Sequence, residues 1–184
     1  MLSVLFVDIR GFTSLAEKTS PTDVAAQLNR FYEAASKAIF RQDGTLDKLV
    51  GDQVMAFFGP PLNHDDHARR AVTTALEISR AIGEFATDDA LAVGVGITTG
   101  EAFVGNVGGS DVTDYTVLGD TVNVAARLES KALSGEILIS QATYDQVADA
   151  FPHATRRELA LKGKSDRVIA WQIAEISSTT ELQP

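Results

Sequence analysis

The chain has 184 residues, of which 45% are hydrophobic and 22% charged, the size and balance of one globular domain. It contains no cysteine, which excludes disulfides and thiolate zinc sites. Its net charge of −9 argues against a nucleic-acid partner, because phosphate backbones require clustered cations.

The N-terminal third predicts a strand followed by a helix. Residues 2–7 form a short apolar, β-branched run that indicates a buried strand ending at Asp8. Ser20 as N-cap and Pro21 in the first turn open a helix. Apolar residues then recur at helical spacing as far as about Arg41.

The middle of the chain predicts a hairpin and a second helix. Residues 45–50 and 53–58 are strand-like, and the two-residue connection Gly51-Asp52 suits a tight turn in which the glycine takes a positive φ. Residues 65–85 return to the helical period. None of these apolar stretches approaches the ~18–20 residues of a membrane span, so we expect no direct membrane insertion.

The second half predicts another hairpin, a helix and a final set of strands. Residues 91–98 and 101–107 form a hairpin candidate around Gly100. Asp120 caps a helix that continues to about Lys131. The remaining pattern indicates a short helix at 141–147 and strands at 137–139, 156–161 and 168–173.

The order of these elements is β-α-β-β-α-β followed by further α and β elements. It predicts an α+β fold with a ferredoxin-like βαββαβ core, and the hairpins disfavour a purely parallel Rossmann sheet. We expect one domain over residues 1–176 and a frayed C-terminal tail over residues 177–184. The sequence is interpreted as a piece of something longer or as a minimal unit.

The segment 6–13 places the carboxylate of Asp8 where the first strand ends and a glycine turn begins. Mg²⁺ takes oxygen ligands, with one or two protein carboxylates completed by phosphates and water. Backbone amides in the turn Gly11-Phe12-Thr13 suit a phosphate group. Taken alone, however, an aspartate at this place is more commonly a cap of the turn.

A second carboxylate, Asp52, stands at the tip of the predicted hairpin, four residues after Lys48. Gly-Asp is by itself an ordinary turn pair. Two carboxylates at the ends of a neighbouring strand and hairpin would nevertheless suit a two-metal site, with ions ~3.5–4 Å apart.

A third segment, 114–128, contains Asn123 and Arg127 four residues apart on a predicted helix. Their side chains therefore share one face. An amide and a guanidinium together suit the orientation of a ribose and the neutralisation of charge on a phosphoryl group in transfer. The simpler alternative is a solvated polar face.

In this order and at this spacing, the three segments together resemble the catalytic domain of class III adenylyl and guanylyl cyclases. The resemblance extends from Phe6 to about Ile173, and it rests on the conjunction of motifs that are each weak alone. It implies a nucleotide cyclase catalytic domain over residues 1–176 that converts ATP to 3′,5′-cyclic AMP and pyrophosphate. Two Mg²⁺ or Mn²⁺ ions per active site would assist attack of the ribose 3′-hydroxyl on the α-phosphate.

The resemblance also implies a role for particular residues. Asp8 and Asp52 would bind the metal ions, together with the carbonyl of Ile9. Asn123 would orient the ribose, and Arg127 would stabilise the transition state.

Two further positions concern the triphosphate. Lys162 resembles the late lysine that grips the triphosphate in this family. The turn 108–111 lacks the basic residue that some members carry there, so no contact from that turn is expected.

Lys48 and Thr116 are expected to read the base, with Val117 beside them on the substrate-binding surface. Adenine offers an acceptor at N1 and a donor at its 6-amino group, and guanine offers the reverse. Lys48 can only donate and the Thr116 hydroxyl can accept, so the pair fits adenine. In guanylyl cyclases the lysine position is commonly glutamate.

Threonine at position 116 departs from the aspartate of many members. It resembles a subgroup of bacterial and soluble cyclases, some of which respond to bicarbonate or CO₂. Because a hydroxyl is a weaker acceptor than a carboxylate, we expect looser discrimination against GTP.

In the family the active site lies between two catalytic domains arranged head to tail. This chain has both kinds of site residue, which implies a homodimer with two equivalent shared sites. The expected partners are therefore ATP, a second copy and a regulatory domain outside this sequence. The expected location is the cytoplasm, and membrane tethering of the full-length protein is left open.

Other interpretations remain open. A guanylate cyclase is disfavoured by Lys48, and a catalytically silent, nucleotide-binding regulatory domain is disfavoured by the intact set of site residues. His64 and His67 could suggest a metal site, but no third ligand is obvious and a structural role is preferred. Gly94 and Gly96 are interpreted as points of close backbone approach.

Overall fold

The computed structural model describes residues 1–84, 91–109, 111–161 and 167–173. Within them, one sheet has the strand order β2-β3-β1-β4-β7-β9-β8, and β5 and β6 form a separate ribbon. The strands are β1 (Leu2–Arg10), β2 (Thr45–Val50), β3 (Gln53–Phe58), β4 (Ala92–Gly100), β5 (Phe103–Gly108), β6 (Thr113–Leu118), β7 (Ile137–Ser140), β8 (Thr155–Leu159) and β9 (Val168–Ile173). The helices are α1 (Phe12–Lys18), α2 (Pro21–Arg41), α3 (His67–Glu84), α4 (Asp120–Glu129) and α5 (Gln141–Tyr144).

The expected ferredoxin-like core is confirmed. Strand β1 pairs antiparallel with β3 on one side and with β4 on the other, and β2 pairs antiparallel with β3. Two β-α-β units therefore interlock in the order β2-β3-β1-β4, which is the split arrangement of this fold. The sheet continues through β7, parallel to β4, and then β9 and β8.

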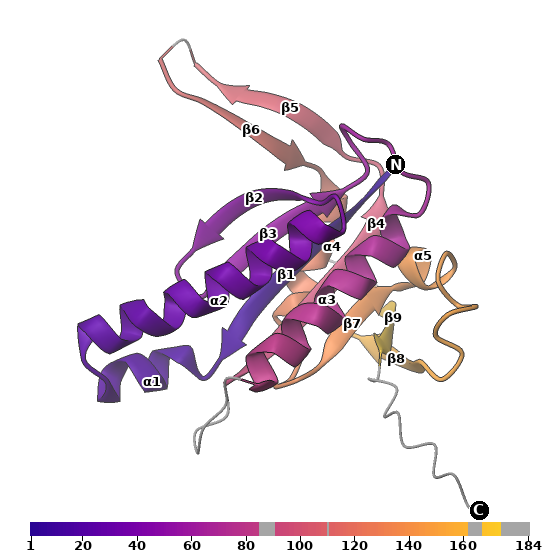
Figure 1. The fold of residues 1–184 in the computed structure, drawn as a ribbon. Helices are drawn as coiled ribbons and strands as arrows, with labels where there is room; N and C mark the ends of the chain where they lie inside the picture. The colour runs from indigo at the N-terminus through magenta and orange to yellow at the C-terminus, as the bar shows by residue number, and fades with distance from the viewer. Residues whose placement is uncertain (85–90, 110, 162–166, 174–184) are drawn as a thin grey trace, which may run out of the picture.

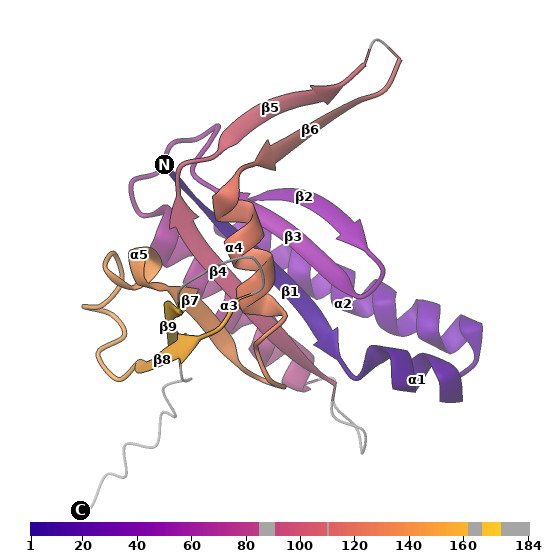
Figure 2. The same cartoon turned by 180° about the vertical axis from the view of Figure 1, so that it is seen from behind.

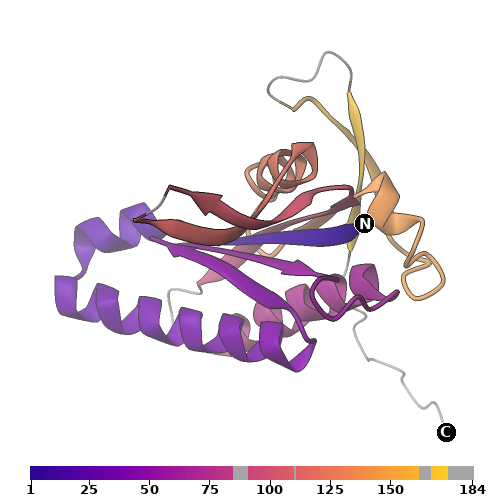
Figure 3. The ribbon, with the colours of Figure 1, turned by 90° about the horizontal axis from the view of Figure 1, so that it is seen from above.

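Helices cover both faces of the sheet. Helices α2 and α3 lie on one face and α4 lies on the other, as Figures 1 and 3 show. Ser20 accepts a hydrogen bond from the backbone N–H of Asp23 (3.2 Å) and Pro21 is the first residue of α2, as the sequence predicts. The largest hydrophobic cluster joins the inner faces of α2 and α3 to the sheet. Burial of this apolar face holds both helices in place.

Helix α4 lies over β1 and β4 of the sheet (Figure 2). A Cβ atom added to Gly96 of β4 would overlap the backbone of Ala125 and Glu129 in α4. The predicted close backbone approach is thus confirmed at Gly96. Only a glycine lets the helix and the strand come this near.

Several boundaries differ from the prediction. Strand β1 continues past Asp8 to Arg10, because β4 still pairs with Ile9 and Arg10 after the pairing with β3 has ended at Asp8, so Asp8 does not end the strand. The helix after residue 119 is preceded by Gly119 as N-cap, and Asp120 is its first helical residue; the prediction of Asp120 as the cap is wrong. Helix α1, which has no fully buried residue, is too short for a periodic apolar signal.

The hairpin predicted around Gly100 is also wrong. Strand β4 pairs with β1 and β7, whereas β5 pairs with β6. The ribbon of β5 and β6 projects away from the main sheet (Figures 1 and 2). The sequence analysis missed β6 because only two of its six residues, Thr116 and Val117, are buried, which leaves no alternating pattern. Among the described residues, no helix combines the length and apolar character needed to cross a membrane.

Candidate active site

Asp8 and Asp52 lie next to each other at one end of the sheet. Asp8 is opposite Gln53 in the β1–β3 register, and the N–H of Ile9 donates to the Asp52 carbonyl oxygen (3.1 Å). The pKa of Asp8 is raised from 3.8 to about 6, first by burial and then by the negative charges of Glu129 and Asp52. The structure thus brings together the two carboxylates that the sequence analysis paired.

The turn that carries Asp52 is anchored to α2. Gly51 takes the predicted positive φ of 59°. Its carbonyl oxygen accepts a hydrogen bond from the hydroxyl of Tyr32, whose pKa is raised by burial and by the nearby charge of Asp52. Tyr32 was not predicted as a site residue, since its place in a helical apolar pattern gives no sign of this contact.

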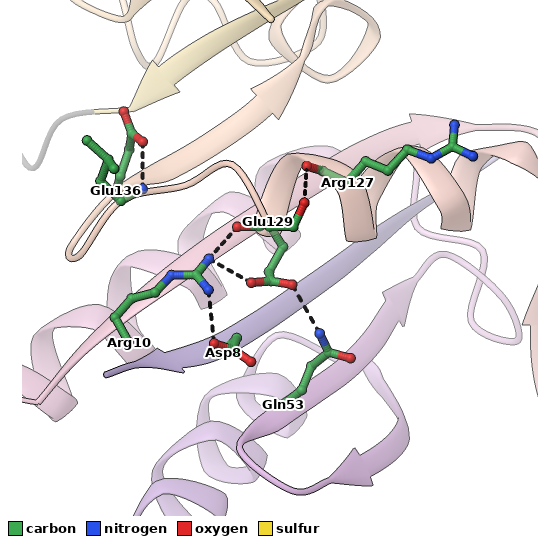
Figure 4. A network of polar contacts seen from close by, with 8 residues as sticks. Asp8, Arg10, Gln53, Arg127, Glu129 and Glu136 are labelled. Atoms are coloured by element: carbon green, nitrogen blue, oxygen red, sulfur yellow. Dashed lines mark hydrogen bonds and ion pairs between the residues drawn. The ribbon is translucent and has the colours of Figure 1, made fainter. Parts of the chain in front are cut away.

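Arg10 connects the Asp8 carboxylate to helix α4. Its Nη1 donates to Asp8 Oδ1 (2.9 Å) and its Nη2 donates to Glu129 Oε1 (2.6 Å), as Figure 4 shows. Gln53 Nε2 donates to the other oxygen of Glu129 (3.0 Å). Burial raises the pKa of Glu129 even though Arg10 opposes the shift. Neither Arg10 nor Glu129 was predicted, because their pairing spans 119 residues of sequence.

The carboxylate and carbonyl oxygens at this end of the sheet are suitable ligands for a hard divalent cation. In the described part of the chain no three His, Cys, Asp or Glu side chains gather into a metal-binding group. Mg²⁺ needs only one or two protein carboxylates when a substrate supplies phosphate oxygens. Asp8 and Asp52, with the carbonyl of Ile9, meet that requirement. Burial and, after it, the negative charges of Glu129 and Asp52 raise the pKa of Asp8, and a bound cation would favour its ionised form.

Lys48 and Thr116 also lie together, although they are 68 residues apart in sequence. Lys48 Nζ of β2 is 3.3 Å from Thr116 Oγ1 of β6. Lys48 also donates to Asp47 (2.8 Å) and to Asp114, and these contacts, that with Asp114 foremost, raise its pKa. The structure places the predicted donor and acceptor side by side.

Asp47 is a further member of this group that the sequence analysis missed. Its side chain has an exposed fraction of 0%, and its Oδ2 accepts from the Thr116 hydroxyl (2.8 Å) and from the N–H of Val117 (3.2 Å). The side chain of Val117 is itself buried. An aspartate beside a lysine on a strand looks like a surface pair, and only the packing of β6 over β2 buries it.

Asn123 and Arg127 both lie on α4, as predicted. In Figure 4 the guanidinium of Arg127 points away from Asp8 and Arg10. Within one protomer the structure therefore does not bring Arg127 to the carboxylate pair.

The remaining predicted positions are those expected to contact the phosphates. Gly11 is the N-cap of α1 with φ 75°, and Phe12 and Thr13 are its first helical residues. Lys162 falls outside the described residues.

The two histidines have structural partners. His67 is buried with its Nδ1 2.9 Å from Ser3 Oγ, and burial lowers its pKa. His64 lies 3.4 Å from Asp43. These contacts agree with the structural role preferred for both.

Comparisons with known proteins place this arrangement in a family. The model of the adenylate and guanylate cyclase catalytic domain matches residues 1–175. Adenylate cyclase 1 of Rhizobium meliloti is 31% identical over 95% of this chain, which spans 28% of that protein's length. The adenylyl cyclase CyaB from P. aeruginosa superposes with a TM-score of 0.86 at 36% identity, over 95% of this chain and 93% of that one. The guanylyl cyclase Cya2 superposes with a TM-score of 0.88 at 34% identity, over 99% and 95%.

The fold and the site define a class III nucleotide cyclase domain. The chain belongs to the family of adenylate and guanylate cyclase catalytic domains. Its similarity to cyclases named for either product leaves the base to be inferred from the site.

Proposed function

We propose that this domain is an adenylate cyclase, which converts ATP to 3′,5′-cyclic AMP and pyrophosphate. The observation that carries the proposal is the contact between Lys48 Nζ and Thr116 Oγ1 (3.3 Å). An ammonium that exchanges its exposed contact with Asp114 for the base can donate to adenine N1, and a hydroxyl beside it can accept from the 6-amino group. Guanine would present a donor to Lys48, which has no acceptor to offer.

In the reaction the ribose 3′-oxygen forms a bond to the α-phosphorus. The bond between the α-phosphorus and the oxygen that bridges to the β-phosphate breaks, and pyrophosphate leaves. Asn123 would orient the ribose, and Arg127 would stabilise negative charge on the phosphoryl group. Asp8, Asp52 and the Ile9 carbonyl would hold two Mg²⁺ or Mn²⁺ ions. When bound, these ions supply positive charge at the triphosphate and lower the pKa of the attacking hydroxyl.

The phosphate-binding part of the proposal rests on the predicted residues. Gly11, Phe12 and Thr13 follow directly after β1, next to the carboxylate pair, where backbone amides would meet phosphate oxygens. Lys162 would contact the triphosphate, as the resemblance implies.

A homodimer with shared sites completes the proposal. Arg127 points away from Asp8 within one protomer (Figure 4), so the two would meet only across an interface. The ribbon of β5 and β6 exposes several large apolar side chains that a second copy would cover. They are Phe103, Val107, Tyr115 and Leu118, with Val112 in the connection between the strands.

The first experiment measures cyclic product from purified protein given ATP, then GTP, with Mg²⁺ or Mn²⁺. Cyclic AMP with little cyclic GMP is expected. The similarity to Cya2 favours guanylate cyclase as the second candidate, and cyclic GMP as main product would establish it. Nucleotide binding without either product would favour a silent regulatory domain.

The shared site is tested by complementation. Asp8→Ala and Arg127→Ala chains should each be inactive alone, and their mixture should recover up to about a quarter of wild-type activity, because mixed dimers hold one intact site. Mixed dimers that form yet stay inactive would refute the shared site.

A regulatory domain elsewhere in a longer protein and a cytoplasmic location stay predictions from the sequence.

A further inference from the structure

We propose that buried Asp47 selects adenine by fixing the direction in which the Thr116 hydroxyl points its proton. The inference deepens the proposed adenylate cyclase function and rests on it for the identity of the base. Asp47 is thus a positioning residue for specificity, which acts through Thr116 and does not itself touch the nucleotide.

The geometry around Asp47 leaves its carboxylate only one role toward Thr116. Oδ2 of Asp47 lies 2.8 Å and Oδ1 lies 3.1 Å from Thr116 Oγ1. The same Oδ2 receives the backbone N–H of Val117 (3.2 Å), and Oδ1 receives Lys48 Nζ (2.8 Å). All three groups donate, as an ionised carboxylate requires.

A threonine hydroxyl has one proton and two lone pairs. Since its proton is directed into the buried Asp47 carboxylate, Thr116 presents only lone pairs elsewhere. One lone pair accepts from Lys48 Nζ (3.3 Å), and among the residues that the structure describes the other remains for a ligand. A hydroxyl in this state accepts from the 6-amino group of adenine and has no proton for the 6-oxo group of guanine.

Without Asp47, the Thr116 hydroxyl would rotate and serve as donor or acceptor. A threonine reads the base ambiguously, whereas an aspartate in its place can only accept. Asp47 therefore supplies to Thr116 the acceptor-only character that the threonine lacks by itself. Lys48 still opposes guanine, so the loss of Asp47 should relax the selectivity for adenine without reversing it.

The test compares wild type with Asp47→Asn, Asp47→Ala and Thr116→Val. In Asp47→Asn the charged Lys48 is expected to retain the amide oxygen, so that the amide nitrogen faces Thr116 and turns its proton outward. Both Asp47 variants should lower the ratio of kcat/KM for ATP over GTP by about fivefold to tenfold, the size of one hydrogen bond. Thermal unfolding identifies any variant that does not fold, and Asp47→Asn, which keeps the side-chain volume, then carries the test.

The decisive arm repeats the Asp47 substitutions in a Thr116→Val background. If Asp47 acts through the hydroxyl, the ATP-to-GTP ratio there should change by less than about twofold. A purely structural Asp47 would lower both rates together and leave the ratio unchanged in the wild-type background, which would overturn the proposal. Equal shifts in both backgrounds would overturn it as well.

Two controls distinguish the effect of Asp47 from an effect on Lys48 or on turnover. Asp114→Asn removes the second carboxylate on Lys48 but does not touch Thr116, so its ATP-to-GTP ratio should stay near wild type; a shift as large as that of Asp47→Asn would assign the effect to Lys48. Competitive binding of ATP and GTP in the presence of Ca²⁺ measures the same preference without turnover. If wild type yields no cyclic product, the proposed function fails, whereas the binding ratios still decide the role of Asp47.

Discussion

The hairpin of β2 and β3 carries two polar clusters that differ in their balance of charge. Around Lys48 on β2, the buried carboxylate of Asp47 finds three donors. Around Asp52 in the turn, Asp8 and Glu129 share the guanidinium of Arg10, and the pKa of both carboxyl groups is raised.

The contrast corresponds to the kind of ligand that each cluster would receive. A neutral base needs fixed donors and acceptors, and the cluster at Lys48 is hydrogen-bonded before any ligand arrives, which is preorganisation. A cation needs negative charge, and the cluster at Asp8 keeps two carboxylates partly buried at a cost in stability, which comes first from their burial. Four predictions test this division, in order of expected effect.

The largest effect concerns catalysis at the carboxylate cluster. Asp8→Ala and Asp52→Ala should each lower kcat for cyclic AMP formation by about a thousandfold or more, because each would remove a ligand of the metal ions. Asp149→Ala, which alters an exposed ion pair with Arg69, is the matched control and should keep full activity. Near-normal turnover in either site variant would show that the substituted carboxylate does not bind a catalytic metal ion.

The second prediction concerns stability at Arg10. Arg10→Met removes the counter-charge that the described residues supply to two neighbouring carboxylates and should lower the free energy of unfolding by about 3 kcal/mol. Urea unfolding of metal-free protein at pH 7.5 measures this change. Arg69→Met, which breaks an exposed ion pair with Asp149, should lower the free energy of unfolding by less than about 1 kcal/mol. Equal losses in the two variants would show that the ion pairs of Arg10 stabilise the protein no more than a surface pair does.

The third prediction concerns the base. Lys48→Glu combined with Thr116→Cys reverses the donor and acceptor presented to the ligand and should raise the GTP-to-ATP ratio of kcat/KM by about tenfold to a hundredfold. Parallel assays of both cyclic products give the ratio. An unchanged ratio would show that these two residues do not read the base.

The smallest effect is the dependence of stability on pH at Asp8. Because its pKa is raised from 3.8 to about 6, ionisation of Asp8 is less favourable in the folded protein than in the unfolded chain. The stability linked to this group is therefore present below pH 3.8 and is lost as the pH rises to about 6. Metal-free Asp8→Asn should gain about 1–2 kcal/mol over wild type at pH 7.5, less than the ~3 kcal/mol of a full two-unit shift, because Asp8 is only partly buried and solvent screens its charge. At pH 3.5 it should gain nothing, and the same gain at both values would point to a cause other than titration.

Sequence reasoning reached those parts of the site that lie in local motifs. Asp52 stands in a recognisable Gly-Asp turn, while Asp8 and Lys48 lie on the strands β1 and β2 close to it. Asn123 and Arg127 share a helical face. The core followed from apolar periodicity, since α2 and α3 bury one continuous stripe each.

The parts that sequence reasoning missed depend on contacts between distant segments. Asp47 becomes buried only where β6 crosses β2, and Glu129 meets Arg10 only because α4 crosses β1 and β4. The predicted pairing of β5 with β4 was wrong for the same reason. A hairpin at Gly100 is locally favourable, but β1 and β7 occupy both edges of β4. No local pattern contains that competition.

Gly96 sets the distance between two elements, α4 and the sheet, that each carry residues of the proposed active site. Because even one methyl group at this position would collide with the backbone of α4, the stand-off between helix and strand is fixed by the absence of a side chain. Asn123 and Arg127 move with α4, while Asp8 moves with the sheet. A residue without a side chain thus acts as a spacer: in the proposed homodimer it fixes, within each protomer, the offset between the part of one shared site that α4 carries and the part of the other site that the sheet carries.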